Sequence, residues 1–188
     1  RETWQYFKDS LTEENNYLPP DNYQIGRKEK FVNRTSSTNI GLAMLAVISS
    51  YDLKYETKEY EYDESDLTGL HIAKSIGLDP DMVFKTLVAR ADKTPYVVFC
   101  IPCAYELDLK KCARMTGNKR IELVAVKELL PLTGYIRGGC SPIGMKKHFP
   151  TFIDETALLF DKITVSAGVR GCQLILSPED LIRYTNAQ

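Results

Sequence analysis

The sequence predicts an α+β fold, in which a curved or barrel-like mixed sheet is surrounded by short helices. Short strand-like segments recur at irregular spacing among short helical segments, which argues against a regular β-α-β array. Hydrophobic residues make up 44% of the 188 residues and charged residues 26%, as in a globular domain. No run approaches the roughly 18 apolar residues that a membrane helix needs.

The period of the apolar residues places the elements in order along the chain. Strands are predicted over residues 54–62, 83–90, 96–102, 121–125, 151–154, 162–166 and 173–176. Helices are predicted over residues 67–76, 109–116 and 127–132, and a glycine-rich loop covers residues 134–144.

Helix ends are marked by residues suited to caps. Gly77 and Gly117 follow the first two helical segments, as glycine does at a C-cap. A last helix begins after Ser177, which is the predicted N-cap, with Pro178 in the first helical position. Asp180 takes the third position of a capping box.

The chain changes character before the strand at 54–62. Residues 1–39 are polar and aromatic and are predicted to form an N-terminal extension. Residues 40–51 carry Met44, Leu45, Val47 and Ile48 on one broad apolar face and are predicted to be helical. The main domain is therefore expected to cover residues 40–188.

Charge and cysteine content limit the function classes. Residues 54–188 contain 18 basic and 18 acidic residues, which gives no support to a large, non-specific nucleic-acid surface but leaves room for one RNA end. Five cysteines without a secretion signal favour reduced thiols in the cytoplasm. Cys100 and Cys103 form a lone C-x-x-C, and Cys100 lies in a predicted strand, so a structural role is favoured over a zinc site, and no metal or cofactor is expected.

One lysine stands inside an apolar strand. Lys85 lies within Met-Val-Phe-Lys-Thr-Leu-Val-Ala-Arg, residues 82–90. Lysine is rarely buried unless it has a partner. Either this strand is an edge with Lys85 facing water, or Lys85 points into a site. By strand alternation Thr86 faces the other way.

An ordered set of motifs covers about 135 residues. They are Gly77-Leu78-Asp79-Pro80, Val83-Phe84-Lys85-Thr86-Leu87, Leu107-Asp108-Leu109-Lys110-Lys111, Thr133-Gly134-Tyr135, Gly138-Gly139-Cys140-Ser141-Pro142-Ile143-Gly144-Met145-Lys146-Lys147, Phe152-Ile153-Asp154-Glu155 and Ser166-Ala167-Gly168-Val169-Arg170-Gly171. In this order they resemble the YbaK family of aminoacyl-tRNA deacylases, relatives of the editing domain of bacterial prolyl-tRNA synthetase.

Residues 1–53 resemble a different kind of protein. Arg1-Glu2-Thr3-Trp4, Leu18-Pro19-Pro20-Asp21-Asn22-Tyr23-Gln24 and the stretch 34–42 are similar to part of the cyclic β-glucan synthases and related phosphorylases. About 50 residues cannot build the helical toroid that this second resemblance implies, so no glycan chemistry is expected.

The first resemblance implies a cytoplasmic enzyme that hydrolyses mischarged aminoacyl-tRNA in trans. The nearest branch implies Cys-tRNA(Pro) as the substrate, whose own thiol assists breakage of its ester. Ala-tRNA(Pro) editing and an inactive tRNA-binding module remain alternatives. The implied partners are the tRNA acceptor end and prolyl-tRNA synthetase, and no membrane is involved.

The same resemblance implies roles for individual residues. Lys85 would be the catalytic residue, holding the terminal ribose or phosphate or stabilising developing charge. Substrate binding would fall to Tyr60, Thr86, Gly138, Gly139, Ser166 and Gly168. The tRNA backbone would meet Lys146, Lys147 and Arg170. A packed strand lysine, a tight turn, a strand-end cap and exposed basic turns are the plainer alternatives for these positions.

Three positions depart from the family pattern. Tyr62 stands where relatives often carry a histidine, Thr68 where some carry an aromatic residue, and Cys140 where an aliphatic residue is usual. A Cys140–His148 nucleophile and base pair is conceivable, but nothing in the spacing establishes one.

Overall fold

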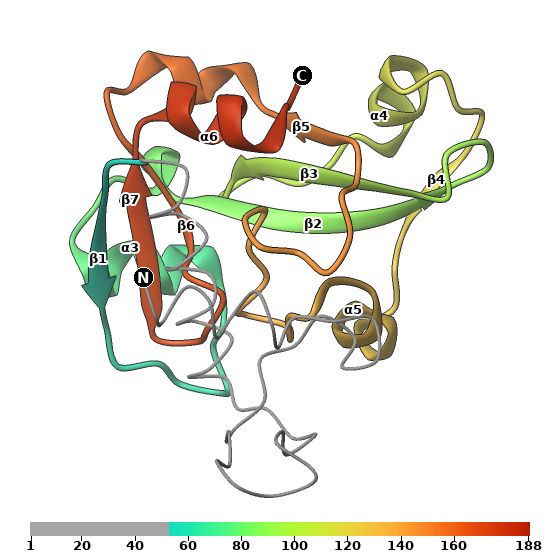
Figure 1. Ribbon diagram of the computed structural model, residues 1–188. Helices are drawn as coiled ribbons and strands as arrows, with labels where there is room; N and C mark the ends of the chain where they lie inside the picture. The colour runs from blue at the N-terminus through green and yellow to red at the C-terminus, as the bar shows by residue number, and fades with distance from the viewer. Residues whose placement is uncertain (1–52) are drawn as a thin grey trace, which may run out of the picture.

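The computed structural model describes residues 53–188 as an α+β structure (Figure 1). The expected extension at 1–39 and the expected helix at 40–51 lie outside the described residues. The strands are β1 (Tyr55–Glu59), β2 (Phe84–Ala91), β3 (Tyr96–Pro102), β4 (Ile121–Leu123), β5 (Thr151–Ile153), β6 (Ile163–Ser166) and β7 (Cys172–Leu176). The helices are α3 (Gly69–Ile76), α4 (Leu109–Met115), α5 (Val126–Thr133), α6 (Pro178–Thr185) and two 3-10 helices, η1 (Pro80–Met82) and η2 (Glu155–Leu159).

The strands form two sheets. The smaller sheet has the order β1-β7-β6 and is antiparallel. The larger has the order β4-β2-β3-β5, with β5 parallel to β3 and the other pairs antiparallel. A single parallel bridge between Val83 and Thr164 joins the two sheets. The predicted α+β class and mixed pairing are confirmed.

The two joined sheets do not close into a complete barrel. A barrel needs every strand paired on both sides around the whole ring. Among residues 53–188, β2 and β6 meet through one bridge instead of a continuous ladder. The ring is therefore not closed.

Local signals explain the helix ends. Thr68 is the N-cap of α3 and accepts a hydrogen bond from the His71 amide, and Gly77 ends that helix at φ 65°. Ser177 caps α6 by accepting from the Asp180 amide at 3.1 Å, which confirms half of the predicted capping box. The Asp180 carboxylate pairs with Arg183 instead of returning to the cap.

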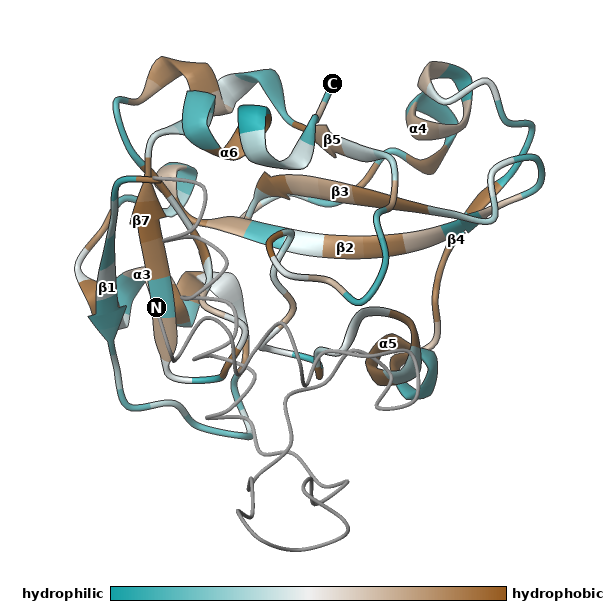
Figure 2. Ribbon diagram, viewed as in Figure 1, coloured by the Kyte–Doolittle hydropathy of each residue, from teal (hydrophilic) through white to brown (hydrophobic). Residues whose placement is uncertain are grey.

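Strand alternation divides the apolar side chains of β2 between the two faces of its sheet. Phe84 and Val88 enter the largest core, which also contains Tyr135, Ile143 and Val165. Figure 2 shows β3 and β7 as strongly hydrophobic strands, whereas β1 is hydrophilic.

The opposite face of β2 has smaller cores. Ala89 packs with Cys112 and Ala113 of α4, and Val83 packs with Ala73 and Ile76 of α3. The odd-numbered residues of β2 therefore share the side of the sheet that α3 and α4 cover. No helix among the described residues is both long and apolar enough to cross a membrane.

Candidate functional site

The bridge between the two sheets places Lys85 and Ser166 on corresponding positions of neighbouring strands. Residues paired across strands point to the same side of the sheet. Val83 and Thr164 are so paired, in parallel, and β2 and β6 lie close to one another. Lys85 and Ser166 each stand two residues further along, so both side chains leave on that same side.

Lys85 is half-buried on an interior strand. Its Nζ donates a hydrogen bond to the Cys103 carbonyl at 3.2 Å. β3 pairs with Lys85 on one side, and on the other side Lys85 lies between the bridge to β6 at Val83 and the β4 pairing that begins at Ala89. An ammonium group carries three donors, and the Cys103 carbonyl occupies one of them.

The start of α3 lies directly behind this contact. A Cβ at Gly69 would fall 2.1 Å from the Cβ of Cys103, so only glycine fits there. The close approach holds Cys103 and its carbonyl in place, and with them the head of Lys85. Gly69 was not among the predicted site residues, and its sequence signal, a glycine at a helix start, is weak.

Thr86 points away from Lys85, as strand alternation predicts. Its hydroxyl lies 3.9 Å from the Cys100 Sγ, on the side of the largest core. Thr86 and Lys85 therefore belong to opposite faces of β2. Thr86 can affect the site through the packing beneath the glycine-rich loop rather than from beside the lysine.

The glycine-rich loop packs closely on the loop after β6. Gly138 has φ 84°, which favours glycine. A Cβ at Gly139 would lie 3.4 Å from the Gly168 carbonyl oxygen, so the two backbones nearly touch. Gly138, Gly139 and Gly168 thus lie close together.

Ser166 and its surroundings form a buried polar group. Ser166 is buried, and its Oγ accepts the Gly168 amide at 3.2 Å, which is the strand-end turn expected as the plain alternative. The hydroxyl keeps its own proton for a second partner. Gln173 is the cross-strand neighbour of Ser166, is 3% exposed, and accepts the Thr164 hydroxyl at 3.3 Å.

Gln173 and Thr164 were missed by the sequence analysis. Gln173 interrupts the apolar strand Cys172–Leu176, as Lys85 interrupts its own strand. The same test of a polar residue inside an apolar run would have found it. Because both side chains are buried and bonded to one another, they stiffen the strand pair that presents Ser166.

The predicted pocket tyrosine lies near the same loop. The Tyr60 amide donates to the Gly171 carbonyl at 2.9 Å, and its side chain packs on the α3 core. Tyr62 is 46% exposed, and a Cβ at Gly171 would lie 3.0 Å from its ring. Tyr62 therefore lies against this turn.

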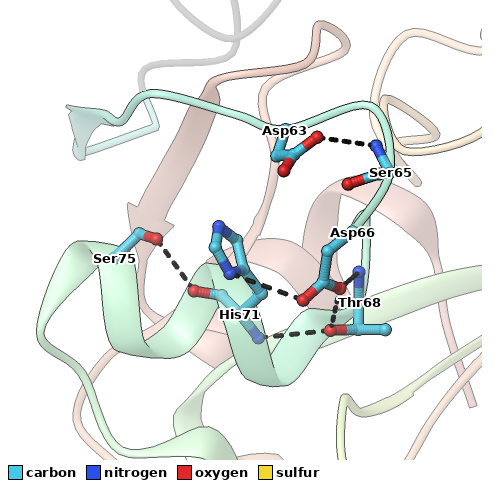
Figure 3. A network of polar contacts seen from close by, with 6 residues as sticks. All are labelled: Asp63, Ser65, Asp66, Thr68, His71 and Ser75. Atoms are coloured by element: carbon cyan, nitrogen blue, oxygen red, sulfur yellow. Dashed lines mark hydrogen bonds and ion pairs between the residues drawn. The ribbon is translucent and has the colours of Figure 1, made fainter.

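Figure 3 shows the polar network that holds the segment before α3. Asp66 accepts from the Thr68 hydroxyl at 2.6 Å and lies 3.5 Å from His71 Nδ1. The hydrogen bonds from Thr68, together with the nearby His71, lower the pKa of Asp66. Leu67 leaves this segment toward Gly138, where a Cβ would approach it to 3.2 Å. The network thus orders a segment that contacts the glycine-rich loop.

Arg170 links three loops. Its Nε donates to the Arg137 carbonyl at 3.0 Å and its Nη1 pairs with Glu64 at 2.9 Å. Its side chain is only 22% exposed. Arg170 is thus neither a solvated turn arginine nor a free cation, and its guanidinium ties the loops around Gly138 together.

Lys146 and Lys147 lie at the far end of the glycine-rich loop. The Lys146 amide donates to the Thr133 carbonyl at 3.1 Å, and partial burial lowers the pKa of its side chain. Lys147 and His148 are exposed. Among residues 53–188, no hydrogen bond or ion pair joins these two lysines to Lys85 or Ser166.

The three cysteines that the sequence singled out, Cys100, Cys103 and Cys140, are buried. Cys140 is buried, and burial raises the pKa of its thiol to about 12, so the Cys140–His148 pair has no thiolate to use. Cys100 and Cys103 lie in different cores, which fits a structural role. The described part of the chain holds no cluster of metal-ligating side chains.

Comparison with known proteins gives a consistent result. Residues 68–184 match the model of the family described as the aminoacyl-tRNA editing domain. EbsC of Enterococcus faecalis (strain ATCC 700802 / V583) is 45% identical over 144 residues, which cover 77% of this chain and 88% of EbsC. Its name gives it, provisionally, as a Cys-tRNA(Pro)/Cys-tRNA(Cys) deacylase.

Two further matches differ in weight. A crystal structure described provisionally as a trans-editing enzyme for prolyl-tRNA synthetase superposes with a TM-score of 0.70 at 24% identity, over 79% of this chain and 93% of that one, and shows the fold. The cyclic β-(1,2)-glucan synthase NdvB of Rhizobium meliloti (strain 1021) is 48% identical over 50 residues, which cover 27% of this chain and 2% of NdvB. So small a share of NdvB transfers no activity.

Proposed function

Because the chain belongs to the aminoacyl-tRNA editing domain family, we propose that it hydrolyses the ester of mischarged aminoacyl-tRNA in trans, with Cys-tRNA(Pro) as its substrate. The observation that carries the proposal is the half-buried Lys85 on the same side of the joined strands as Ser166. The likeness to EbsC supports the choice of substrate. The free thiols of this chain and its family membership favour a cytoplasmic site of action.

The proposed chemistry needs positioning more than a nucleophile. An aminoacyl ester is already activated, so holding it and stabilising developing negative charge lowers most of the barrier. The Lys85 ammonium has donors beyond the one given to Cys103, and these can meet the 3′-terminal phosphate or the ester oxygen. The Ser166 hydroxyl and the backbone N–H groups near Gly139 are the other proposed hydrogen-bond donors to the substrate.

The substrate can provide the attacking group itself. The thiol of an esterified cysteine loses its proton and attacks its own carbonyl, and the bond to the ribose oxygen breaks as that oxygen takes up a proton. Water then opens the small cyclic thioester to give free cysteine. This course suits a site whose buried Cys140 cannot act as a nucleophile.

Alanine remains the second candidate amino acid. Small side chains are distinguished only weakly by apolar pockets, by roughly 10- to 200-fold per methylene. Thr68, where some relatives carry an aromatic residue, is exposed and serves as the cap of α3, so it closes less of the pocket. Alanine lacks a thiol, so its release would require an activated water instead.

The first test is a panel of charged tRNAs. Purified protein is incubated with Cys-tRNA(Pro), Ala-tRNA(Pro), Pro-tRNA(Pro) and Cys-tRNA(Cys), and release of the amino acid is followed. We expect fast release from Cys-tRNA(Pro) and none from Pro-tRNA(Pro). Lys85→Ala should lower the rate at least 100-fold, about 2.7 kcal/mol of transition-state stabilisation.

The exposed Lys162 offers a matched control. It directly precedes β6, and its exposed side chain pairs with Glu56 on β1. Lys162→Ala should hydrolyse Cys-tRNA(Pro) at the normal rate. Undiminished release by Lys85→Ala would remove the assigned role of Lys85, and tRNA binding without turnover of any substrate would instead indicate the binding-module alternative.

A further inference from the structure

The outward side of α4 carries three basic side chains beside the exposed Met115. Lys110, Lys111 and Arg114 are exposed, whereas Cys112 and Ala113 are buried against the sheet. Positions 110, 111 and 114 lie on one side of a helix. None of the three side chains forms an ion pair within the described residues. We call these three residues the α4 basic face.

The nearby acidic groups offset only part of the charge of this face, because Asp108 interacts electrostatically with Lys110 and Arg114 without forming an ion pair with either. The Asp108 carboxylate is the N-cap of α4, where it accepts the amides of Lys110 and Lys111 at 3.0 and 2.9 Å. Asp92 accepts the amides of Lys119 and Arg120 in the same way, and the Arg120 side chain pairs with Glu122. Residues 108–120 contain five basic residues and one acidic residue, in a domain whose residues 54–188 carry no net charge.

The α4 basic face and Lys85 lie on the same side of the larger sheet. Ala89 packs against α4, and Lys85, four residues earlier on β2, shares the face of Ala89. Ala91 at the other end of β2 pairs with Ile121, which directly follows Arg120. Six residues of strand separate Lys85 from that end, about 20 Å. Figure 1 shows α4 toward the β4 end of β2, away from β6 and β7.

We propose that the α4 basic face binds the phosphate backbone of the acceptor arm of the tRNA whose 3′ ester lies at Lys85. This inference rests on the proposed function, because that function places the tRNA end at Lys85. Unpaired lysine and arginine side chains bind phosphates and release their counterions. RNA duplexes are recognised mainly through backbone and shape, which suits a strip of cations without a base-reading element.

The position favours RNA over an acidic protein partner. A nucleic acid fixed by its end at Lys85 must pass along the protein, and the α4 basic face lies on the same side of the sheet, toward the end of β2 that is about 20 Å from Lys85. Phosphate contacts from only three side chains also agree with the balanced total charge of the domain. Binding of a phosphate backbone at one place needs a local strip of cations and does not need a basic domain. Lys146 and Lys147 belong to the other face of β2 and are a separate candidate.

The experiment compares two triple variants on two substrates. The test variant is Lys110→Gln, Lys111→Gln and Arg114→Gln, and the control variant is Lys127→Gln, Lys162→Gln and Arg183→Gln, three exposed cations elsewhere. Each enzyme is given Cys-tRNA(Pro) and a cysteinylated CCA trinucleotide, which is too short to reach α4. The rate at saturation and the half-saturating concentration are measured between 50 and 300 mM salt, about the range in which such contacts are sensitive.

We expect the test variant to need about tenfold more Cys-tRNA(Pro) for half-saturation, with an unchanged maximal rate. Its slope of log affinity against log salt should be smaller by about 2 to 3. On the trinucleotide the test variant should have the same half-saturating concentration and maximal rate as the natural chain. The control variant should match the natural chain on both substrates. The single substitution Arg114→Gln should raise the half-saturating concentration about twofold, which keeps the test decisive if the triple variant unfolds.

Several results would overturn the inference. The test variant could show an unchanged half-saturating concentration for Cys-tRNA(Pro), or an equal loss of affinity for the trinucleotide. It could also bind tRNA normally but lose binding to prolyl-tRNA synthetase, which would assign the α4 basic face to a protein partner. Binding of uncharged tRNA(Pro) separates the two proposals. If the natural chain released no amino acid but the test variant still bound this tRNA about tenfold more weakly, the proposed function would fail and the α4 assignment would stand.

Discussion

At the scale of single residues, Cys140 and Lys85 show how burial decides chemistry. Both depart from what their surroundings suggest: a thiol in a glycine-rich loop and a cation in an apolar strand. Burial keeps the Cys140 thiol protonated, because its pKa is raised to about 12. Lys85 keeps an ammonium donor in place because the Cys103 carbonyl accepts from it. Cys140 is therefore no longer a candidate catalytic residue, whereas Lys85 remains one.

The substitution Cys140→Ala tests the first half of that statement. The side chain is 9% exposed in the largest core, so losing the sulfur should cost about 1 kcal/mol of stability. The rate of cysteine release should stay within about twofold, because no step uses this thiol. Chemical denaturation and a deacylation assay measure the two effects, and loss of activity in a folded variant would restore Cys140 as a candidate.

Gly138 and Gly77 form a natural pair for a second substitution. Both have positive φ, 84° and 65°, so alanine should cost each about 1 to 2 kcal/mol of stability. Around Gly77 a Cβ meets open space, whereas at Gly138 it approaches Leu67 and the Arg170 side chain. Gly138→Ala should therefore also displace the loops of the site and lower the rate of deacylation at least tenfold.

The Gly77→Ala variant is the control for that displacement. Gly77 ends α3 on the far side from the loops of the site. The variant should therefore be less stable but should deacylate at the normal rate while it is folded. If the two variants lost stability and activity in equal measure, Gly138 would have only the role of a turn. Melting temperature and single-turnover rates distinguish these results.

At the scale of elements, the sequence pattern predicted the strand bounds and helix caps that depend on neighbouring residues in the chain. The strand at 96–102 has the predicted bounds, and Gly77 and Ser177 cap helices as expected. The strand predicted over 54–62 ends at Glu59, because Tyr60 and Tyr62 turn to meet Gly171. The two 3-10 helices carry too few residues to show a period.

The candidate site was predictable where a residue contradicts its own strand. Lys85 among apolar neighbours, and the glycines before and after the strands, are visible in the sequence. The Cys103 carbonyl that holds Lys85 and the link from Arg170 to Glu64, 106 residues apart, are not. Such contacts depend on how two sheets meet, and the single bridge from Val83 to Thr164 leaves no local pattern.

At the scale of the whole molecule, aspartates that bind backbone amides set the response to acid. Hydrogen bonds lower the pKa of Asp63, Asp66, Asp92 and Asp108 below the ordinary value of 3.8, and in Asp63, Asp92 and Asp108 backbone amides are the first cause. A lysine and an arginine lower the pKa of Glu56 and Glu128 below 4.5. Each carboxylate thus binds its proton more weakly in the folded chain than in the unfolded one.

This sign fixes the direction of the pH dependence. Where the folded pKa is the lower one, the unfolded chain takes up protons first as the pH falls, so folding loses stability. The stabilisation is complete above about pH 5 and disappears as the pH falls through the lowered values, below 3.8. Urea midpoints at pH 7, 5, 4 and 3 should therefore be nearly constant at first and then fall steeply.

The double substitution Asp92→Asn and Asp108→Asn separates the hydrogen bonds from the charge. Asparagine oxygen still accepts the amides at these two turns, so the midpoint at pH 7 should fall only slightly. Because asparagine does not titrate, the fall between pH 5 and pH 3 should be shallower than in the natural chain. Added salt should weaken the contribution of the exposed Glu56–Lys162 pair without removing that of the amide bonds. An equally steep fall in the double variant would show that other carboxylates control acid unfolding.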